Sequence, residues 1–266
     1  MSKLRAMTLE AATTPQSGVL DVPAGWRQGP GAYGGLVVAS MMRAAEQAIG
    51  DATRTIRSVT SEIPAPVEPG RADFAVEILR AGKSVTTARV ALKQNGETRA
   101  HAVVIAATAR PGSGDAALSW NTLVPPYAPA WDSVPELPPS PMFPEFAQHF
   151  DFRIVEGVPA AGTPAQCIGW VKARDPGSRR DAAYLAAMID VWFPMALVRA
   201  KQMRPMATIA FTLEIIGDVG DVDDAPLLYR GVSPVCADGY SFETRELWTA
   251  DGRLLARNHQ TFVIIK

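Results

Sequence analysis

The sequence predicts an α+β fold in which one structural unit occurs twice in tandem. Three observations lead to this prediction: a helix-like segment in each half, strand-like segments after each helix, and a proline-rich segment between the halves. Each unit is expected to be a long central helix wrapped by a curved antiparallel sheet, and internal duplication explains the repeat most economically. We place the units at residues 1–120 and 147–266, joined by a linker at 121–146 and packed as a pseudo-dimer.

The composition fits a folded protein with a large core. The chain has 266 residues, of which 47% are hydrophobic and 20% are charged, so disorder is not expected. The formal net charge is −1, without the basic face that binding to nucleic acid or a membrane surface usually needs. We therefore expect no nucleic-acid partner and no membrane partner.

Targeting and metal signals are also missing from the sequence. The first fifteen residues lack the apolar core of a signal peptide, and Asp190 and Pro194 interrupt the longest apolar segment well short of a membrane span. The two cysteines, Cys167 and Cys236, match no metal-binding or redox spacing. A reduced, cytoplasmic protein with no metal and no cofactor is the expectation.

In the first unit, the stretch 31–51 has apolar residues at helical spacing and glycines at its start. Strand-like segments follow at 58–64 and 72–108. The dipeptide Asn95-Gly96 favours a type I′ hairpin turn between two of these strands. The unit therefore reads as one helix followed by an antiparallel meander.

The connecting stretch 125–144 contains eight prolines in twenty residues. Proline removes a backbone donor and fixes φ, so neither a helix nor a central strand tolerates this density. An extended connector is predicted.

The second unit repeats the pattern, with a helix predicted over 181–198 and Asp181 as its N-cap. Pro194 cannot donate to the carbonyl of Asp190, so the helix should kink or stop there. Strands are predicted at 206–216 and within 226–265, with a second type I′ turn at Asp251-Gly252.

A helix lying along a strongly curved antiparallel sheet describes the hotdog fold, and two fused copies make a double hotdog. At this level the sequence resembles the type II acyl-CoA thioesterases, whose members are double hotdogs. The likeness rests on residues 32–44 and 77–96, on Asp190 in the second helix, and on Thr208 and Gln260 in later strands. The resemblance implies hydrolysis of an acyl-CoA substrate to a free acid and coenzyme A, and a place in fatty acid metabolism.

Carried over residue by residue, the resemblance implies that Asp190, Thr208 and Gln260 are catalytic and hold the attacking water. From the residues alone, Asp190 is as consistent with a structural role as with function, because buried acids occur in both settings. Strand alternation places Thr208 on the face opposite Phe211, where threonine is an ordinary strand residue. The same alternation places Gln260 on one face with Phe262.

Glycines at the start of the first helix leave backbone amides exposed. Gly34 and Gly35 are therefore candidates for binding the substrate and stabilising an oxyanion, although close helix packing explains them equally well. The histidines His101, His149 and His259 lack a nearby acid in the sequence and are expected to be structural. The basic loop 172–180 is expected to be solvated, with contacts to coenzyme A phosphates as the alternative.

Two other functions remain open. A hydratase or dehydratase of acyl thioesters shares the fold but generally needs a histidine paired with an acid. A non-catalytic, acyl-CoA-binding double hotdog is the second alternative, because the residues that follow Ile209 and Gln260 differ from those of better-known thioesterases. A homo-oligomer, dimeric or larger, is expected because hotdog sheets often associate further.

Overall fold

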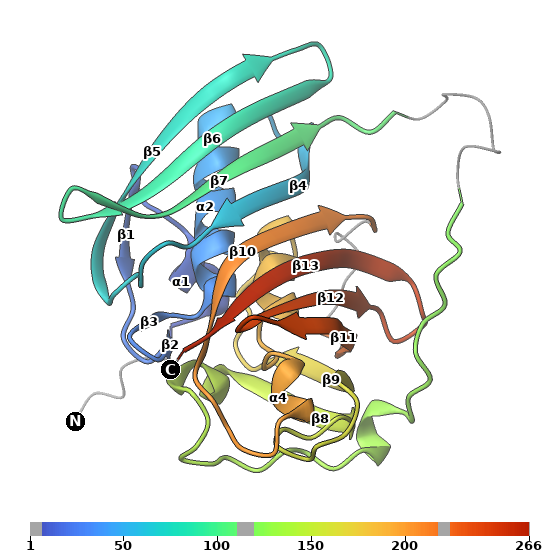
Figure 1. Ribbon diagram of the computed structural model, residues 1–266. Coiled ribbons are helices and arrows are strands. Elements are labelled where there is room, and N and C mark those ends of the chain that lie inside the picture. Colours follow the sequence, from blue (N-terminus) through green and yellow to red (C-terminus); the bar gives the residue numbers. More distant parts are fainter. Residues whose placement is uncertain (1–6, 111–119, 218–223, 266) are drawn as a thin grey trace, which may run out of the picture.

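Each half of the chain forms a helix and a curved antiparallel sheet in the computed structural model, which describes residues 7–110, 120–217 and 224–265 (Figure 1). The first half contains, in chain order, α1 (Leu9–Thr13), β1 (Val19–Val22), β2 (Arg27–Gln28), β3 (Gly31–Ala32), α2 (Gly34–Ile49), β4 (Thr55–Glu62), β5 (Gly70–Ala81), β6 (Val85–Gln94) and β7 (Glu97–Ala107). The second contains β8 (Phe150–Glu156), β9 (Gln166–Ala173), α3 (Ala182–Ile189), α4 (Ala196–Arg199), β10 (Met206–Ile215), β11 (Leu227–Ala237), β12 (Tyr240–Trp248) and β13 (Leu254–Ile264).

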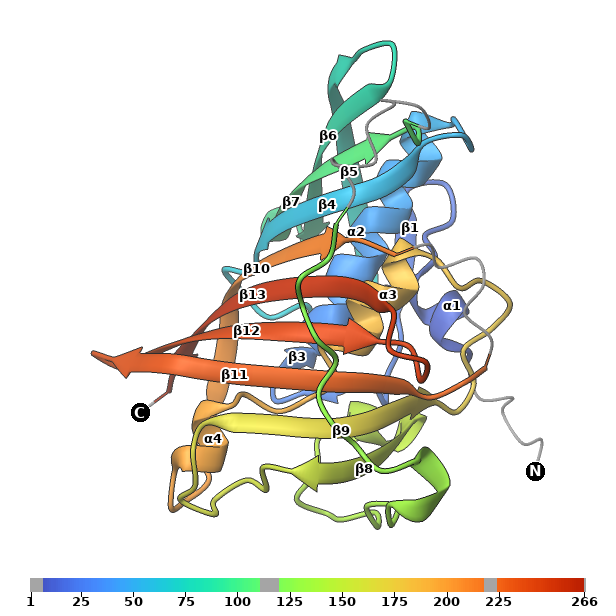
Figure 2. The same ribbon diagram turned by 90° about the vertical axis from the view of Figure 1, so that its right-hand side faces the viewer.

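One eleven-stranded sheet runs through both halves in the order β1-β5-β6-β7-β4-β10-β13-β12-β11-β9-β8. The halves join where β4 pairs with β10 in antiparallel register, from Glu62 opposite Ala210 to Ser58 opposite Glu214. The sheet curves around α2 and α3, which lie side by side on its inner face (Figures 1 and 2). This arrangement confirms the predicted α+β double hotdog.

The two central helices differ in length. Helix α2 ends at Gly50, which takes the left-handed conformation (φ 63°) that favours glycine. Helix α3 begins after Asp181, whose side chain accepts the amide of Tyr184 at 2.8 Å, as predicted. It ends at Ile189 with Asp190 as its C-cap, so the predicted helix over 181–198 is interrupted, and the second central helix is short. All eight residues of α3 are buried, because it lies between α2 and the sheet.

Of the two predicted type I′ turns, the one at Asn95-Gly96 is confirmed and the one at Asp251-Gly252 is not. Asn95 and Gly96 both have positive φ (53° and 82°), as a type I′ turn requires. At the second turn only Gly252 has a positive φ (85°), and its amide bonds the carbonyl of Thr249 at 3.0 Å. The prediction of a type I′ turn at Asp251-Gly252 is therefore wrong, because the connection is longer and Asp251 keeps an ordinary conformation.

The proline-rich connector crosses the outer face of the second half's sheet (Figure 2). Trp131 and Val134 pack there in a small apolar cluster with Trp170 and Trp248. Arg153 fixes the connector by donating to the carbonyls of Trp131 and Val134 at 2.9 and 2.7 Å. A short 3-10 helix, η2 (Trp131–Ser133), forms within it, and a second, η3 (Glu145–His149), follows its last proline. It is thus extended over much of its length but also packed onto the sheet.

None of the helices among the described residues is both long enough and apolar enough to cross a membrane.

Candidate active site at the helix junction

Asp190 lies where the C-terminal end of α3 meets the N-terminal end of α2. Its residue surface is 5% exposed. The contact is so close that a Cβ atom at Gly34 would lie 2.8 Å from Oδ2 of Asp190. At Gly35 a Cβ would lie 2.9 Å from the Asp190 Cβ and 3.0 Å from the carbonyl oxygen of Ala187. Both glycines are therefore needed for the carboxylate of one half to reach the helix of the other.

A chain of hydrogen bonds joins the three residues that the resemblance singled out. The Thr208 hydroxyl donates to Oε1 of Gln260 at 3.1 Å, and Nε2 of Gln260 donates to Oδ1 of Asp190 at 2.7 Å. The same Nε2 also donates to Oδ1 of Asn258 at 2.8 Å. Asp190, Thr208 and Gln260 come from three different elements and meet at one polar site, with Gln260 in the middle.

Thr208 reaches this site because of a β-bulge. The ladder between β10 and β13 shifts register between Thr208 and Ala210, so that Thr208 lies opposite Phe262 and Phe211 lies opposite Gln260. The bulged residue, Ile209, inverts the alternation and turns Thr208 to the inner face. The prediction that Thr208 faces away from Phe211 is therefore wrong, whereas Gln260 and Phe262 share the inner face as expected.

A buried ion network lies behind Asp190 and had no counterpart in the sequence predictions. Arg245 on β12 is fully buried, and its Nη1 lies 3.1 Å from Oδ1 of Asp190 and donates to the carbonyl of Ile189 at 3.2 Å. Its Nε donates to Oε1 of Glu243 at 2.6 Å, and the other oxygen of Glu243 accepts the amide of Met195 at 2.8 Å. Two carboxylates thus share one guanidinium, so that one negative charge is left uncompensated whenever both are ionised.

Burial governs the electrostatics of these groups. Burial raises the pKa of Asp190 above its usual range, although Arg245, Gln260 and the amide of Gly35 each act to lower it. Burial likewise raises the pKa of Glu243 against the opposing effect of Arg245. A carboxylate with a raised pKa is a stronger base once it is ionised. The amide of Gly35 is used by Asp190 itself in this structure.

Tyr33, the N-cap of α2, places a second polar group beside Asp190. Its ring lies close to Gly35, since a Cβ there would be 2.7 Å from its Cε2. The hydroxyl is buried without a hydrogen-bond partner among the described residues. Burial and the negative charge of Asp190 raise the pKa of Tyr33. A buried hydroxyl without a partner is unusual in a folded protein.

The polar residues belong to one half of the double fold. A matching bulge between Ile56 and Ser58 in the ladder of β4 and β7 aligns the two halves strand by strand. Asp190 and Met42 each lie nine residues after the N-cap of their helix. In this alignment Asp190, Thr208 and Gln260 correspond to Met42, Ile56 and Val104, which are fully buried and apolar. The described residues therefore form one such polar site, and its counterpart in the first half is core.

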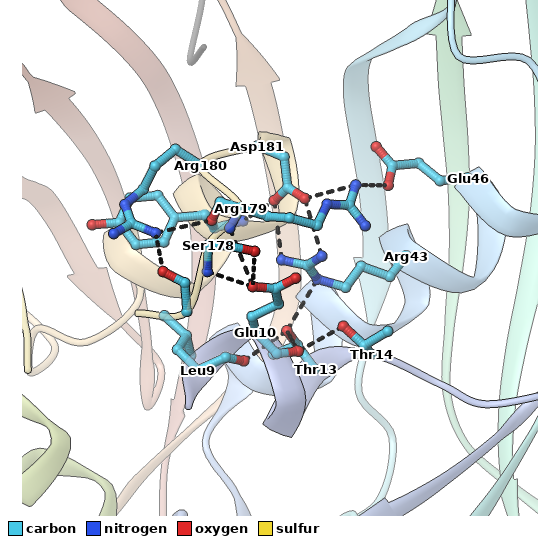
Figure 3. Close-up of polar contacts among 12 residues, drawn as sticks. Leu9, Glu10, Thr13, Thr14, Arg43, Glu46, Ser178, Arg179, Arg180 and Asp181 are labelled. Carbon is cyan, nitrogen blue, oxygen red and sulfur yellow. Dashed lines mark hydrogen bonds and ion pairs between the residues drawn. The ribbon is translucent and has the colours of Figure 1, made fainter. Parts of the chain in front are cut away.

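Residues of the basic loop 172–180 form ion pairs and hydrogen bonds with other residues of the chain (Figure 3). Arg179 lies 2.9 Å from both Glu46 and Asp181, and Arg180 pairs with Asp224. Glu10 of α1 accepts the amide of Ser178 at 2.6 Å, which fastens the N-terminal helix to the loop. Since its arginines already have carboxylate partners, the loop offers little for a phosphate.

The histidines lie outside the polar site. His149 stacks on Trp26, with ring centroids 3.7 Å apart, and contacts the carbonyl of Gly25. His101 pairs with Glu62 at 3.2 Å, where both side chains are nearly half exposed, and His259 is exposed on the outer face of β13. These positions agree with structural roles.

Comparison with known protein families identifies both halves. Residues 22–110 match a model of the acyl-CoA thioesterase N-terminal domain, and residues 124–264 match one of the acyl-CoA thioesterase C-terminal domain. The chain belongs to the acyl-CoA thioesterase family. The polar site combines both family domains, because Gly34 and Gly35 lie in the first and Asp190, Thr208 and Gln260 in the second.

Solved structures share the fold over nearly the whole chain. A conserved protein of unknown function with a hot dog fold from Alicyclobacillus acidocaldarius is 24% identical, with a TM-score of 0.86 and coverage of 97% of this chain and 98% of that one. An acyl-CoA thioesterase II from Mycobacterium marinum is 23% identical, with a TM-score of 0.71 and coverage of 87% and 88%. No curated protein sequence matches the chain. At these identities the structural likeness establishes the fold of this acyl-CoA thioesterase family member.

Proposed function

We propose that this protein hydrolyses acyl-CoA to a free carboxylic acid and coenzyme A, using a water held by Asp190, Thr208 and Gln260. The observation that carries the proposal is the hydrogen-bonded chain from Thr208 through Gln260 to Asp190, located at the N-terminal end of α2. Thioester hydrolysis needs a base, an oriented water and donors for the developing oxyanion. Asp190 supports this proposal as a base, Gln260 and Thr208 as groups able to orient a water, and the N-terminal end of α2 as a source of backbone donors.

Asp190 serves as the general base in this mechanism. The carboxylate removes a proton from the water as the water oxygen attacks the thioester carbon, and the sulfur leaves as the thiolate of coenzyme A. Gln260 and Thr208 fix the direction of the water through their hydrogen-bonding groups. No covalent intermediate with the protein is required.

The N-terminal end of α2 supplies stabilisation for the thioester oxygen. Because the amide of Gly35 already bonds Asp190, we assign the amide of Gly34 to the developing oxyanion, aided by the positive end of the helix dipole. The unpartnered hydroxyl of Tyr33 is a second donor for the water or the substrate. Gly34 and Thr208 are both half-buried, so the substrate approaches Asp190 between them.

The hydratase alternative receives less support from the geometry. Its chemistry needs a histidine paired with an acid, and the His101–Glu62 pair is on the outer face of the sheet, away from Asp190. The non-catalytic alternative predicts binding of acyl-CoA without turnover. An assay of thioester turnover distinguishes this alternative from the proposed hydrolase.

The test is a screen of purified protein against acyl-CoAs of graded chain length. Loss of the thioester absorbance is the appropriate signal, because exposed Cys236 would react with thiol reagents. Hydrolysis of at least one substrate, with no hydration of the corresponding enoyl-CoA, is the expected result. Tight binding of acyl-CoA with no hydrolysis would replace the proposal with the non-catalytic alternative.

A further inference from the structure

A pocket of about 340 Å³ lies between α4 and the ends of three strands of the second half. Its lining includes Leu197, Met206 and Ile264, which are apolar, and Arg199, Arg204 and Cys236. Ligand pockets in proteins start at about this size. The lining contains two arginines and no acidic residue, so the pocket favours an anion with an apolar portion.

The two arginines have no internal partner. The side chains of Arg199 and Arg204 make no ion pair or hydrogen bond to another residue in the described part of the chain, and both residues are exposed. The arginines of the basic loop, in contrast, all have carboxylate partners. Free guanidinium groups are well suited to phosphate because they donate two hydrogen bonds in a fixed plane.

The pocket continues the inner face that carries the polar site. Met206 lies opposite Ile264 in the ladder of β10 and β13, two residues along from the pair Thr208 and Phe262. Residues two apart in a strand share a face and lie roughly 7 Å apart. Arg204 precedes Thr208 by four residues, so their Cα atoms are at most about 14 Å apart. A ligand in the pocket can therefore extend toward Asp190.

The pocket is fixed by hydrogen bonds from outside it. Residues Ala160 and Gly162 donate to the carbonyls of Leu197 and Val198 at 2.8 and 2.9 Å, which holds α4 in place. On the other side, the amide of Ile265 bonds the carbonyl of Pro205 at 2.9 Å. Backbone hydrogen bonds thus hold the segments next to both arginines.

We propose that this pocket binds the phosphate-bearing end of coenzyme A, with Arg199 and Arg204 as the phosphate ligands. The proposal rests on the proposed thioesterase function, since it assigns one end of that substrate. Coenzyme A separates its phosphates from the thioester by a flexible arm, which matches a cationic pocket offset from Asp190. The smaller pocket of about 160 Å³ near α2 is a poorer candidate, because its Arg54 already bonds Asp51 at 2.9 Å.

The activity test compares substrates with and without the phosphates. In the double variant Arg199→Ala/Arg204→Ala, KM for acyl-CoA is expected to rise about 10-fold, as for two exposed charge-assisted contacts. Kinetics with the same acyl group on N-acetylcysteamine should not change. The matched control, Arg80→Ala/Arg89→Ala, removes two exposed arginines from β5 and β6 and should leave the kinetics with both substrates unchanged. Equal effects on both substrates, or none on acyl-CoA, would overturn the proposal.

Cys236 gives a binding test that does not depend on activity. Its thiol is exposed in the pocket, whereas Cys167 is buried with its pKa raised by burial and should not react. Desulfo-coenzyme A, which lacks a competing thiol, should slow alkylation of Cys236 by iodoacetamide in the wild-type protein but not in Arg199→Ala/Arg204→Ala.

The two tests separate the proposals. If the protein hydrolyses no thioester but desulfo-coenzyme A protects Cys236, the thioesterase proposal fails and the binding site stands. If thioesters are hydrolysed but Cys236 is not protected at concentrations that saturate catalysis, the site is wrong. Protection by inorganic phosphate at the same concentration would also overturn it, because the pocket would then be a general anion site.

Discussion

Replacing Arg245 by methionine should expose how much the candidate site depends on its buried cation. Nη1 of Arg245 lies 3.1 Å from Asp190 and its Nε lies 2.6 Å from Glu243, and the side chain is 0% exposed. Arg245→Met leaves two buried carboxylates without their cationic partner, which costs about 3–5 kcal/mol. For a chain of this length each kcal/mol corresponds to about 2–4 °C in Tm. We therefore expect a fall of roughly 10 °C or more, partly restored in Arg245→Met/Glu243→Gln.

Arg245→Met and the single variant Glu243→Gln should move the pH dependence of catalysis in opposite directions. Asp190 must be ionised to act as a base, so kcat/KM rises with pH through its pKa. Removing the cation raises that pKa further, and Arg245→Met should shift the acidic limb to higher pH. Glu243→Gln removes the competing carboxylate, so the charge of Arg245 acts on Asp190 alone and the limb should shift to lower pH.

The measurement is kcat/KM across the stable pH range, followed by thioester absorbance, with thermal melting of each variant. Glu243→Gln is the matched control, because it also alters the buried network but leaves the contact between Arg245 and Asp190 in place. If Arg245→Met and Glu243→Gln are both active and both keep the acidic limb of the wild-type kcat/KM profile, Asp190 does not titrate as the base and the reasoning is refuted.

Three further substitutions probe the junction between the helices. Gly35→Ala introduces a Cβ within 3.0 Å of Tyr33, Asp190 and a carbonyl, and should destabilise the fold by about 1–3 kcal/mol in a thermal melt; an unchanged Tm would contradict the packing described. Tyr33→Phe should leave Tm unchanged or raise it, since a buried hydroxyl without a partner is removed, while kcat falls; an unchanged kcat would exclude Tyr33 from the reaction. Gln260→Ala should lower kcat less than Asp190→Asn does, and combining the two should add little, because both residues act on one water; additive losses would mean separate roles.

Much of the fold was accessible from the sequence because helix and strand periodicities appear in both halves. The helix stop at Asp190 followed from Pro194, and the N-cap role of Asp181 from its place before an apolar run. The geometry of the candidate site was harder to predict. Thr208 reaches the inner face through a bulge at Ile209, and a one-residue insertion in a ladder leaves no mark in the alternation of a single strand.

The buried ion network could not be predicted for a related reason. Glu243 and Arg245 alternate with Phe242 and Thr244 in β12, a pattern equally typical of an exposed strand face. Only the register between β12 and β13, with Glu243 opposite Gln260, shows that the charged residues point inward. The packing of the connector depends on similar long-range contacts, such as Arg153 with Trp131, which local sequence does not encode.

Asp190→Asn should also show how far the ionised carboxylate of Asp190 destabilises the folded state. Burial raises the pKa of Asp190, so ionising it destabilises the folded state, and this penalty develops as pH rises from the unfolded value of about 4 through the folded pKa. The variant should therefore melt at or above the wild-type temperature at neutral pH, with the difference shrinking toward pH 4. A variant that melts lower at neutral pH would show that the charge is structural.

The turnover number of Asp190→Asn on the best acyl-CoA substrate is the most direct test of the proposed catalytic role of Asp190. Asparagine keeps the size of the side chain and removes the base, so kcat should fall by about 10²–10⁴-fold while the fold is retained. Asp21→Asn, at an exposed acid on β1, should hydrolyse at the wild-type rate. If Asp190→Asn also hydrolyses at the wild-type rate, Asp190 is not the catalytic base and the proposed mechanism is wrong.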